Sequence, residues 1–319
     1  MRTKIVCLLA ILCTSIVLNA QINVGDASDP TLMNKGGSFD KKDVEAFKTT
    51  TTICFLQNKD KAKIADYQIA ASQVWTFNKI EFATVNDLPK YEGKPGYSFI
   101  TITGLVDYKG NASSTSSYFL KFWYPYEKKN GKMDEKVIAR VDLYLDPGSD
   151  GEIVYGKGKK DEKTAYMVSD QATYYNLSPG FMKCYLSVIN KYLNDKKKLY
   201  RFAEEEDKML LKKLETDTLF LPDYIKLGNG MATGKMRDEK KLMEKYEYKY
   251  SFIANDALSQ KILSAQKNTF VFSYIYFSSQ KFYTIYEAQK GTVVYSAYES
   301  MSMNGLNDGD FKKLSKNIK

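Results

Sequence analysis

Two stretches of similar residue pattern recur along the chain. The segment TTTICFL at 50–56 resembles ETDTLFL at 215–221, and KIEFATVNDL at 79–88 resembles KYSFIANDAL at 249–258. Aromatic segments follow each copy, at 97–104 and 269–277. A repeat of this length restricts the chain to a fold built from two similar units, because each copy has to form the same supersecondary structure.

The number of residues that separates matching positions in the sequence stays nearly constant over several elements and then becomes smaller. The separations are 166 for Ile53 and Leu219, 169 for Asn86 and Asn255, 171 for Phe99 and Phe270, 163 for Phe119 and Phe282, and 130 for Phe181 and Phe311. A constant separation followed by shortening is typical of a duplicated domain whose second copy has shorter loops. We therefore expect a tandem duplication.

Hydrophobic periodicity gives each copy the element order β-α-β-α-β-β-β-α. Apolar residues recur at helical spacing over 61–75 and 181–193, and alternate over 136–145. Asn130-Gly131 favours the tight turn of a hairpin. Because β-α-β units pair strands in parallel and hairpins pair them antiparallel, we predict an α/β fold with mixed α+β character. Each copy would contain a mixed sheet packed by helices.

The predicted domain limits follow from these patterns. Residues 1–20 read as a signal peptide, and the polar segment 21–44 as a flexible arm. The first α/β repeat covers 45–195, a charged linker helix covers 196–213, and the second repeat covers 214–319.

The signal peptide is inferred from the first residues. Arg2 and Lys4 precede an apolar run from Ile5 to Leu18, and the small Ala20 precedes Gln21. This pattern predicts cleavage between Ala20 and Gln21 and export to the periplasm or the outside of the cell. No later stretch is apolar enough to span a membrane, so we expect no transmembrane segment in the mature chain.

Two cysteines, Cys54 and Cys184, remain after the leader. Export permits a disulfide between them. Both also lie in apolar segments, an expected strand and an expected helix, where cysteine commonly serves as a small buried hydrophobic residue. The sequence leaves both alternatives open.

Histidine is absent from all 319 residues. Ser-His-Asp and Cys-His catalysis and histidine-ligated zinc are therefore excluded. A pair of carboxylates remains available for hydrolysis of a glycan, but the acidic residues mostly neighbour lysines, as on helix surfaces. The sequence assigns no catalytic residue and no cofactor, and favours a protein that is not an enzyme.

One loop partly resembles a calcium-binding loop. Asp146 and Asp150 occupy its first and fifth positions, and Gly151 occupies the sharp turn. Lys157 stands where a bidentate glutamate is needed, so Asp146 and Asp150 are weak metal candidates. The glycine-rich segment 228–235 has the wrong spacing for a phosphate-binding loop, and Asn111 and Asn176 fit the N-glycosylation pattern.

The net charge and the tyrosine content indicate which kinds of partner the protein can bind. The net charge of +9 is spread over mixed acidic and basic runs, which argues against a nucleic-acid partner. The 25 tyrosines suit half-buried strands and surfaces that contact glycans or proteins. We expect an exported, non-catalytic protein of the bacterial envelope that binds a macromolecule or a glycan. The alternatives are a carboxylate-pair hydrolase and a structural component that self-associates through a strand edge. The oligomeric state stays open.

Overall fold

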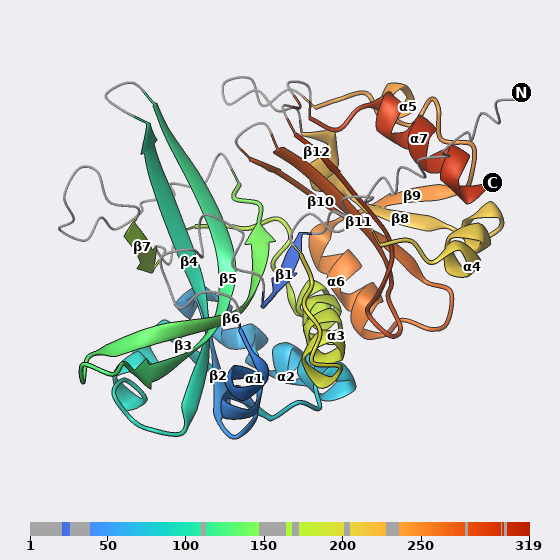
Figure 1. Ribbon diagram of the computed structural model, residues 1–319. Coiled ribbons are helices and arrows are strands. Elements are labelled where there is room, and N and C mark those ends of the chain that lie inside the picture. The colour runs from blue at the N-terminus through green and yellow to red at the C-terminus, as the bar shows by residue number, and fades with distance from the viewer. Residues whose placement is uncertain are drawn as a thin grey trace, which may run out of the picture.

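The strands of the protein form two sheets, one in each half of the chain (Figure 1). The computed structural model describes residues 21–25, 39–109, 113–146, 164–167, 172–200, 205–227, 236–277, 280–300, 302 and 305–319. In Figure 1 the first sheet lies on the left, the second at the upper right, and helix α3 between them. Both sheets contain parallel and antiparallel pairs, so the expected α/β fold with two mixed sheets packed by helices is confirmed.

The first sheet has the strand order β1-β6-β5-β4-β2-β3, with β7 paired to β4. Strand β2 is parallel to β3 and β4, whereas β4, β5 and β6 are antiparallel. Its elements are β1 (Ile22–Val24), α1 (Lys41–Lys48), β2 (Thr51–Leu56), α2 (Ile64–Val74), β3 (Lys79–Thr84), β4 (Tyr97–Lys109), β5 (Ser113–Glu127), β6 (Met133–Leu143), β7 (Thr164–Met167) and α3 (Pro179–Asn194). Short 3₁₀ helices cover Asn58–Lys63 and Val85–Lys90.

The second sheet has the order β12-β11-β10-β8-β9. Strand β8 is parallel to β9 and β10, and β10, β11 and β12 are antiparallel. Its elements are α4 (Lys208–Leu211), β8 (Leu219–Pro222), α5 (Glu239–Leu242), β9 (Tyr250–Ile253), α6 (Asn255–Leu263), β10 (Phe270–Phe277), β11 (Gln280–Glu287), β12 (Thr292–Glu299) and α7 (Asp308–Ile318). Further 3₁₀ helices cover Lys212–Glu215 and Asp223–Lys226.

Five strands of the first sheet, β6-β5-β4-β2-β3, have the order and the directions of the five strands of the second sheet, and each sheet has a β-bulge in its last hairpin. In the first hairpin the bulge lies between Phe122 and Trp123, and in the second between Ile285 and Tyr286. When the bulges are aligned, Ile100, the partner of Phe122, corresponds to Phe272, the partner of Ile285. Ile100 packs in the core beneath α3 and Phe272 in the core beneath α7, so both face the helix that follows their hairpin.

Two of the residue matches expected in the parallel strands, Ile53 with Leu219 and Phe99 with Phe270, are wrong by one position, whereas the match of 79–82 with 249–252 agrees with the strand pairing. The sequence paired Phe99 with Phe270, but Phe99 lies in a small cluster on the face away from α3, whereas Phe270 lies in the core beneath α7. Successive strand residues point to opposite faces, so a shift of one residue exchanges core and outer positions. The match between Phe119 and Phe282 agrees with the bulge alignment.

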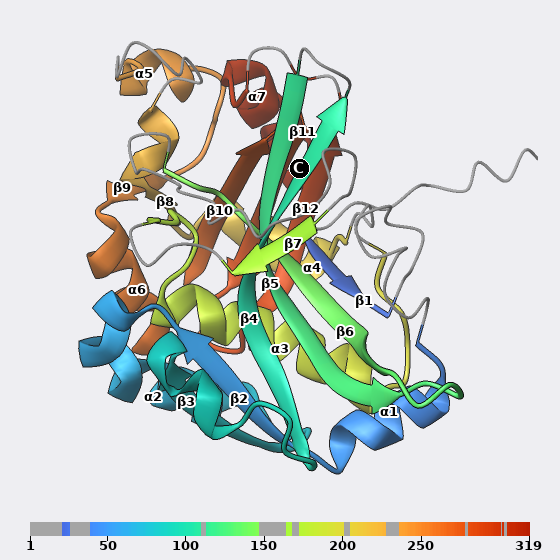
Figure 2. The ribbon, with the colours of Figure 1, turned by 90° about the vertical axis from the view of Figure 1, so that its left-hand side faces the viewer.

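Strand β1 contradicts the expectation of a flexible arm over residues 21–44. Ile22 pairs with Val141 and Val24 with Ala139 at the edge of the first sheet, beside β6 in Figure 2. Both side chains are at most 1% exposed. Helix α1 begins within the same segment, where Asp40 caps it. The short apolar alternation of β1 was hidden by its polar surroundings in the sequence.

The connection between the halves also differs from the expected charged helix over 196–213. Its described residues contain only a short helix, α4, and the adjoining 3₁₀ turn. Leu199 instead forms a bridge with Val24, and Glu206 forms one with Tyr295. Backbone pairing to both sheets therefore replaces helical hydrogen bonding here. None of the described helices is long and apolar enough to cross a membrane.

Candidate functional site

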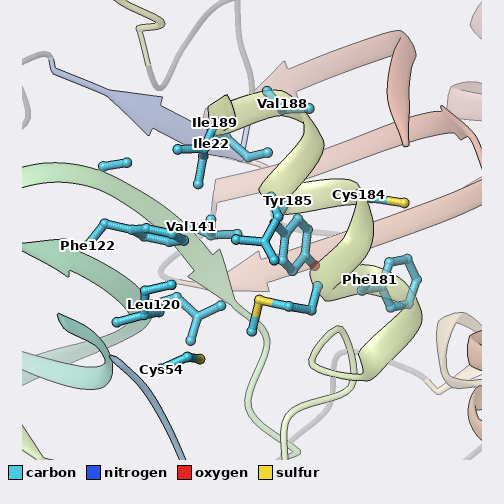
Figure 3. Close-up of a cluster of buried hydrophobic side chains, with 14 of the residues drawn as sticks. Ile22, Cys54, Leu120, Phe122, Val141, Phe181, Cys184, Tyr185, Val188 and Ile189 are labelled. Carbon is cyan, nitrogen blue, oxygen red and sulfur yellow. The ribbon is translucent and has the colours of Figure 1, made fainter. Parts of the chain in front are cut away.

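Helix α3 lies between the first sheet and the second half of the chain. Its side chains Tyr185 and Ile189 point toward the first sheet (Figure 3), and Phe181 stacks on Tyr185 with ring centroids 6.2 Å apart. On another side, Ser187 Oγ donates a hydrogen bond of 2.6 Å to the Lys290 carbonyl in the β11–β12 turn. Gly291 in that turn has φ +67°, and a Cβ there would lie 3.0 Å from the Cα of Cys184. We call this contact between α3, α6 and the β11–β12 turn the seam.

A buried lysine joins α3 to α6 across the seam. Lys183 is 2% exposed, and its Nζ donates a hydrogen bond of 3.1 Å to the Ile262 carbonyl in the last turn of α6. Burial lowers the pKa of this lysine. A cation at the carboxyl end of a helix also meets the negative end of the helix dipole. The contact therefore holds α3 against the carboxyl end of α6.

A groove of about 640 Å³ runs along the seam beside the β11–β12 turn. We call it the seam groove. The residues that line it come from α3, from the connection between the halves (residues 196–213, from here on the connector), from the α6–β10 turn and from the β11–β12 hairpin. They are Lys191, Glu205, Glu206, Asp207, Leu210, Lys267, Asn268, Glu287, Gln289, Lys290, Thr292 and Val293. Its volume lies in the range of small-molecule and peptide-segment sites.

Three of the four acids in the seam groove have partners within the protein. Asp207 Oδ1 accepts the Met209 and Leu210 amides at 3.1 and 3.0 Å and so caps α4. The Glu287 carboxylate accepts two amides of the β11–β12 turn. Glu205 accepts a hydrogen bond from the hydroxyl of Tyr192, whose pKa is raised by burial and by this contact. These hydrogen bonds fix the three carboxylates within the walls of the groove, and both oxygens of Glu287 are used in this way.

The groove is polar and carries charges of both signs. Lys191, Lys267 and Lys290 face the four acids, and all three lysines are exposed. Leu210 and Val293 supply apolar wall. Such a surface suits a ligand with hydroxyl, amide or paired charged groups, because each can find an oppositely polarised partner.

The carboxyl ends of the parallel strands, where open α/β sheets commonly bind ligands, are covered by the chain itself. Gln57, directly after β2, donates to the Ala172 carbonyl at 2.9 Å. Asn255, the first residue of α6 after β9, donates to the Tyr175 carbonyl at 3.0 Å. The segment from Ala172 to Tyr175 therefore crosses the strand ends of both sheets, which leaves the seam groove as the stronger candidate.

Asp146, the first metal candidate, lies beside a group of tyrosines where the halves meet. Its carboxylate accepts the Tyr175 hydroxyl at 2.7 Å. The Tyr175 ring stacks on Tyr224 with centroids 4.9 Å apart, and Tyr144 meets both rings edge-on. Burial raises the pKa of Tyr144 to about 12. Asp146 thus orients a ring in this cluster.

The second metal candidate, Asp150, lies outside the described residues, as do Ala20, Asn111 and the segment 228–235. Gln21, on the other side of the predicted cleavage site, is described and buried. Among the described residues, no group of three or more Cys, Asp or Glu side chains is placed to hold a metal ion. Asn176 is buried and hydrogen-bonded to Tyr144, Asp142 and Tyr185, so its side chain is not accessible to a glycosylating enzyme in the folded protein.

Cys54 and Cys184 are free thiols, both fully buried. Cys54 faces the core from β2, whereas Cys184 points away from that sheet on the other side of α3 (Figure 3). Burial raises the pKa of both thiols, that of Cys184 to about 12. They occupy the positions of small hydrophobic residues, and the structure contains no disulfide between them.

Sequence reasoning did not find the seam groove. It assigned the acidic run around Glu205 to a solvated helix. The sequence does contain a signal for the start of a helix at this point, since Asp207 precedes the apolar residues Met209-Leu210-Leu211. This signal places the acidic run before α4 and not within a helix. Nothing in the sequence could have brought Lys191 beside Lys290, because that contact depends on how α3 packs.

Comparison of the chain with protein-family models, with curated proteins and with solved structures finds no match.

Proposed function

We propose that the protein is an exported, non-catalytic binding protein of the bacterial envelope, and that its ligand occupies the seam groove. The single observation that carries this proposal is a groove of about 640 Å³ lined by Lys191 of α3, by the connector and by turns and strands of the second half. The leader pattern from Arg2 to Ala20 supports export. The absence of histidine from the sequence supports a binding role over acid–base chemistry.

The chemistry of the groove favours a glycan or a polar segment of another protein. Its walls carry three lysines and four carboxylates. A uniformly basic groove would favour a phosphate polymer, whereas a groove with charges of both signs pairs with hydroxyl, amide or zwitterionic groups.

The test uses the exported protein and a matched pair of double variants. Lys267→Glu with Lys290→Glu reverses two charges in the seam groove. Lys312→Glu with Lys316→Glu reverses two exposed charges on α7, outside the groove. Both proteins are applied to a glycan array and to immobilised envelope fractions, and affinities are measured for every ligand that the wild type retains.

We expect the groove variant to lose at least about tenfold in affinity, since two charge-assisted contacts are each worth more than 1 kcal/mol. The α7 variant should bind as the wild type does. Equal loss in both variants, or binding by the wild type to none of the probes, contradicts the proposal.

A second candidate is a carboxylate-pair hydrolase that acts on a glycan. It is favoured by the presence of four acids, Glu205, Glu206, Asp207 and Glu287, in one groove. Glycoside hydrolysis needs two of them across the scissile bond. Release of reducing ends from a bound glycan, abolished by Glu206→Gln and retained in Glu299→Gln on the exposed end of β12, would establish this function in place of simple binding.

We also propose that the two halves arose by tandem duplication of one β-α-β-α-β-β-β-α domain, covering 45–195 and 214–319. The common strand order, the common strand directions and the aligned bulges support it. Helices α3 and α7 occupy the same place after their hairpins, and each has glycine at its second position, Gly180 and Gly309. Significant similarity between the halves in an alignment of related sequences, when aligned on the bulges, is the test.

A further inference from the structure

Strand β1 contacts both halves of the protein although it contains only three residues. Its apolar side chains, Ile22 and Val24, enter the core beneath α3. Gln21 instead reaches the second sheet, where its Nε2 donates to the Tyr286 hydroxyl at 3.0 Å and its Oε1 accepts from Ser273 Oγ at 3.2 Å. Gln21 is 1% exposed. In Figure 1, β1 lies in the middle of the molecule, between the two sheets.

The backbone of β1 is fixed at both of its ends. The Asp142 amide donates to the Gln21 carbonyl at 3.0 Å, and the Gly25 amide donates to the Ile138 carbonyl at 2.8 Å. Gly25 has φ +68°, and a Cβ there would lie 1.9 Å from the ring of Phe39. The chain can therefore leave β1 in this direction only because residue 25 is glycine.

The same strand holds the connector between the halves. Val24 and Leu199 exchange two backbone hydrogen bonds, each of 2.9 Å. Farther along the connector, the Asp207 amide donates to the Val294 carbonyl at 2.9 Å, and the Ser296 amide donates to the Glu205 carbonyl at 2.9 Å. One end of the connector is thus pinned by β1 and the other by β12. The second end, Glu205 to Asp207, is a wall of the seam groove.

We propose that β1 is a strap that locks the two halves together and sets the position of the connector wall of the seam groove. Gln21 ties the first sheet to the second, and Val24 holds Leu199 at the start of the connector, whose other end is the groove wall from Glu205 to Asp207. When the strap is undocked, the connector loses its backbone pairing with β1 while Glu205 keeps its contacts with β12 and with Tyr192, and the groove wall moves more freely. That the strap governs ligand binding rests on the proposed function of the groove, whereas its effect on the connector does not.

The test is hydrogen–deuterium exchange of the exported protein without any ligand. Gln21→Ala removes both contacts to the second sheet and leaves Ile22 and Val24 in place. Gln73→Ala is the matched control, because Gln73 also bonds across the halves, to the Leu263 carbonyl at 3.2 Å, but is exposed.

We expect Gln21→Ala to speed exchange at Leu199 and at Asp207 by about tenfold or more, the equivalent of one lost buried hydrogen bond. Gln73→Ala should leave both amides as in the wild type. If Gln21→Ala does not fold, Gln21→Asn, which shortens the side chain by one methylene, takes its place.

Unchanged exchange at Leu199 and Asp207 in a folded Gln21 variant overturns the strap, whether or not a ligand is known. Faster exchange confined to β1 overturns it as well, because the connector would then be independent of β1. A groove that binds no ligand while the connector responds as expected would refute the proposed function and leave the strap standing.

Discussion

Gly180 offers a sharp test of how tightly the two halves are packed. It is the second residue of α3, and a Cβ placed on it would lie 2.7 Å from the Ser259 carbonyl oxygen, 2.8 Å from the Ser259 Cα and 3.0 Å from the Ile262 Cβ. Two of these atoms belong to the backbone of α6, which cannot turn aside. Gly180→Ala should therefore push α3 and α6 apart by roughly half an ångström, toward ordinary carbon contact distances.

The expected cost follows from opposing contributions. Overpacking a well-filled contact costs about 1–3 kcal/mol. The shift also lengthens the hydrogen bond of 3.0 Å from the Gly180 amide to Ser259 Oγ, a loss of up to about 1 kcal/mol. Alanine returns at most about 1 kcal/mol through its better helix propensity. The free energy of unfolding should fall by about 1–3 kcal/mol in sum.

Gly309→Ala is the matched control, since Gly309 holds the same position in α7. A Cβ there would meet only the side-chain oxygen of Asn307, at 2.8 Å. The gain in helix propensity and the disturbance of that cap are each about 1 kcal/mol or less, and they oppose one another. Denaturant unfolding curves give the free energy of unfolding of both variants. In thermal unfolding, the melting temperature should fall by about 2 °C for each kcal/mol of stability lost. A Gly180→Ala protein as stable as the wild type would refute the close packing of α3 on α6.

Three further predictions concern buried groups. Burial raises the pKa of Tyr144 from 10 to about 12. The stability that comes from burying the neutral hydroxyl is therefore fully present below pH 10 and is lost as the pH rises through 12. In the Tyr144→Phe variant, the melting temperature should fall less steeply at alkaline pH than in the wild type. The Nζ of Lys281 lies 2.7 Å from the carboxylate of Asp310, and Lys281→Met leaves that buried carboxylate without its cation. The free energy of unfolding should fall by about 3–5 kcal/mol. Adding Asp310→Asn to this variant should restore part of the lost stability. Cys54 and Cys184 should resist a thiol reagent in the native protein and react after unfolding, with the same migration in reducing and non-reducing gels; a shift on reduction would restore the disulfide alternative.

The local elements were readable from the sequence because their signals are local. The alternation over 136–145 falls largely within β6, Met133–Leu143, and the apolar stripe expected over 181–193 lies within α3. The hairpin turn expected at Asn130-Gly131 is present, and Gly131 has φ +76°, but φ of Asn130 is not positive, so the loop closed by Lys128 and Lys132 is longer than a two-residue turn. Each of these features depends on side chains a few residues apart.

The sequence misjudged the elements whose stability comes from distant partners. Ile22–Val24 is too short to form a strand alone and is held by β6, Leu199 and the second sheet. The connector around Leu199 carries a helix-like charge pattern, yet its backbone hydrogen bonds go to β1. Tertiary pairing decides such segments, since their own propensity is weak.

Local pattern thus determined that this chain makes two mixed α/β sheets with a helix after each hairpin, because alternation and helical periodicity state which face of each element is apolar. Only the tertiary structure decided that α3 serves both halves, that β1 joins them, and that Lys191, Glu205 and Lys290 meet in one groove. A sequence specifies apolar faces but not which face covers which, and the seam follows from that choice, down to the absence of a side chain at Gly180 and Gly291.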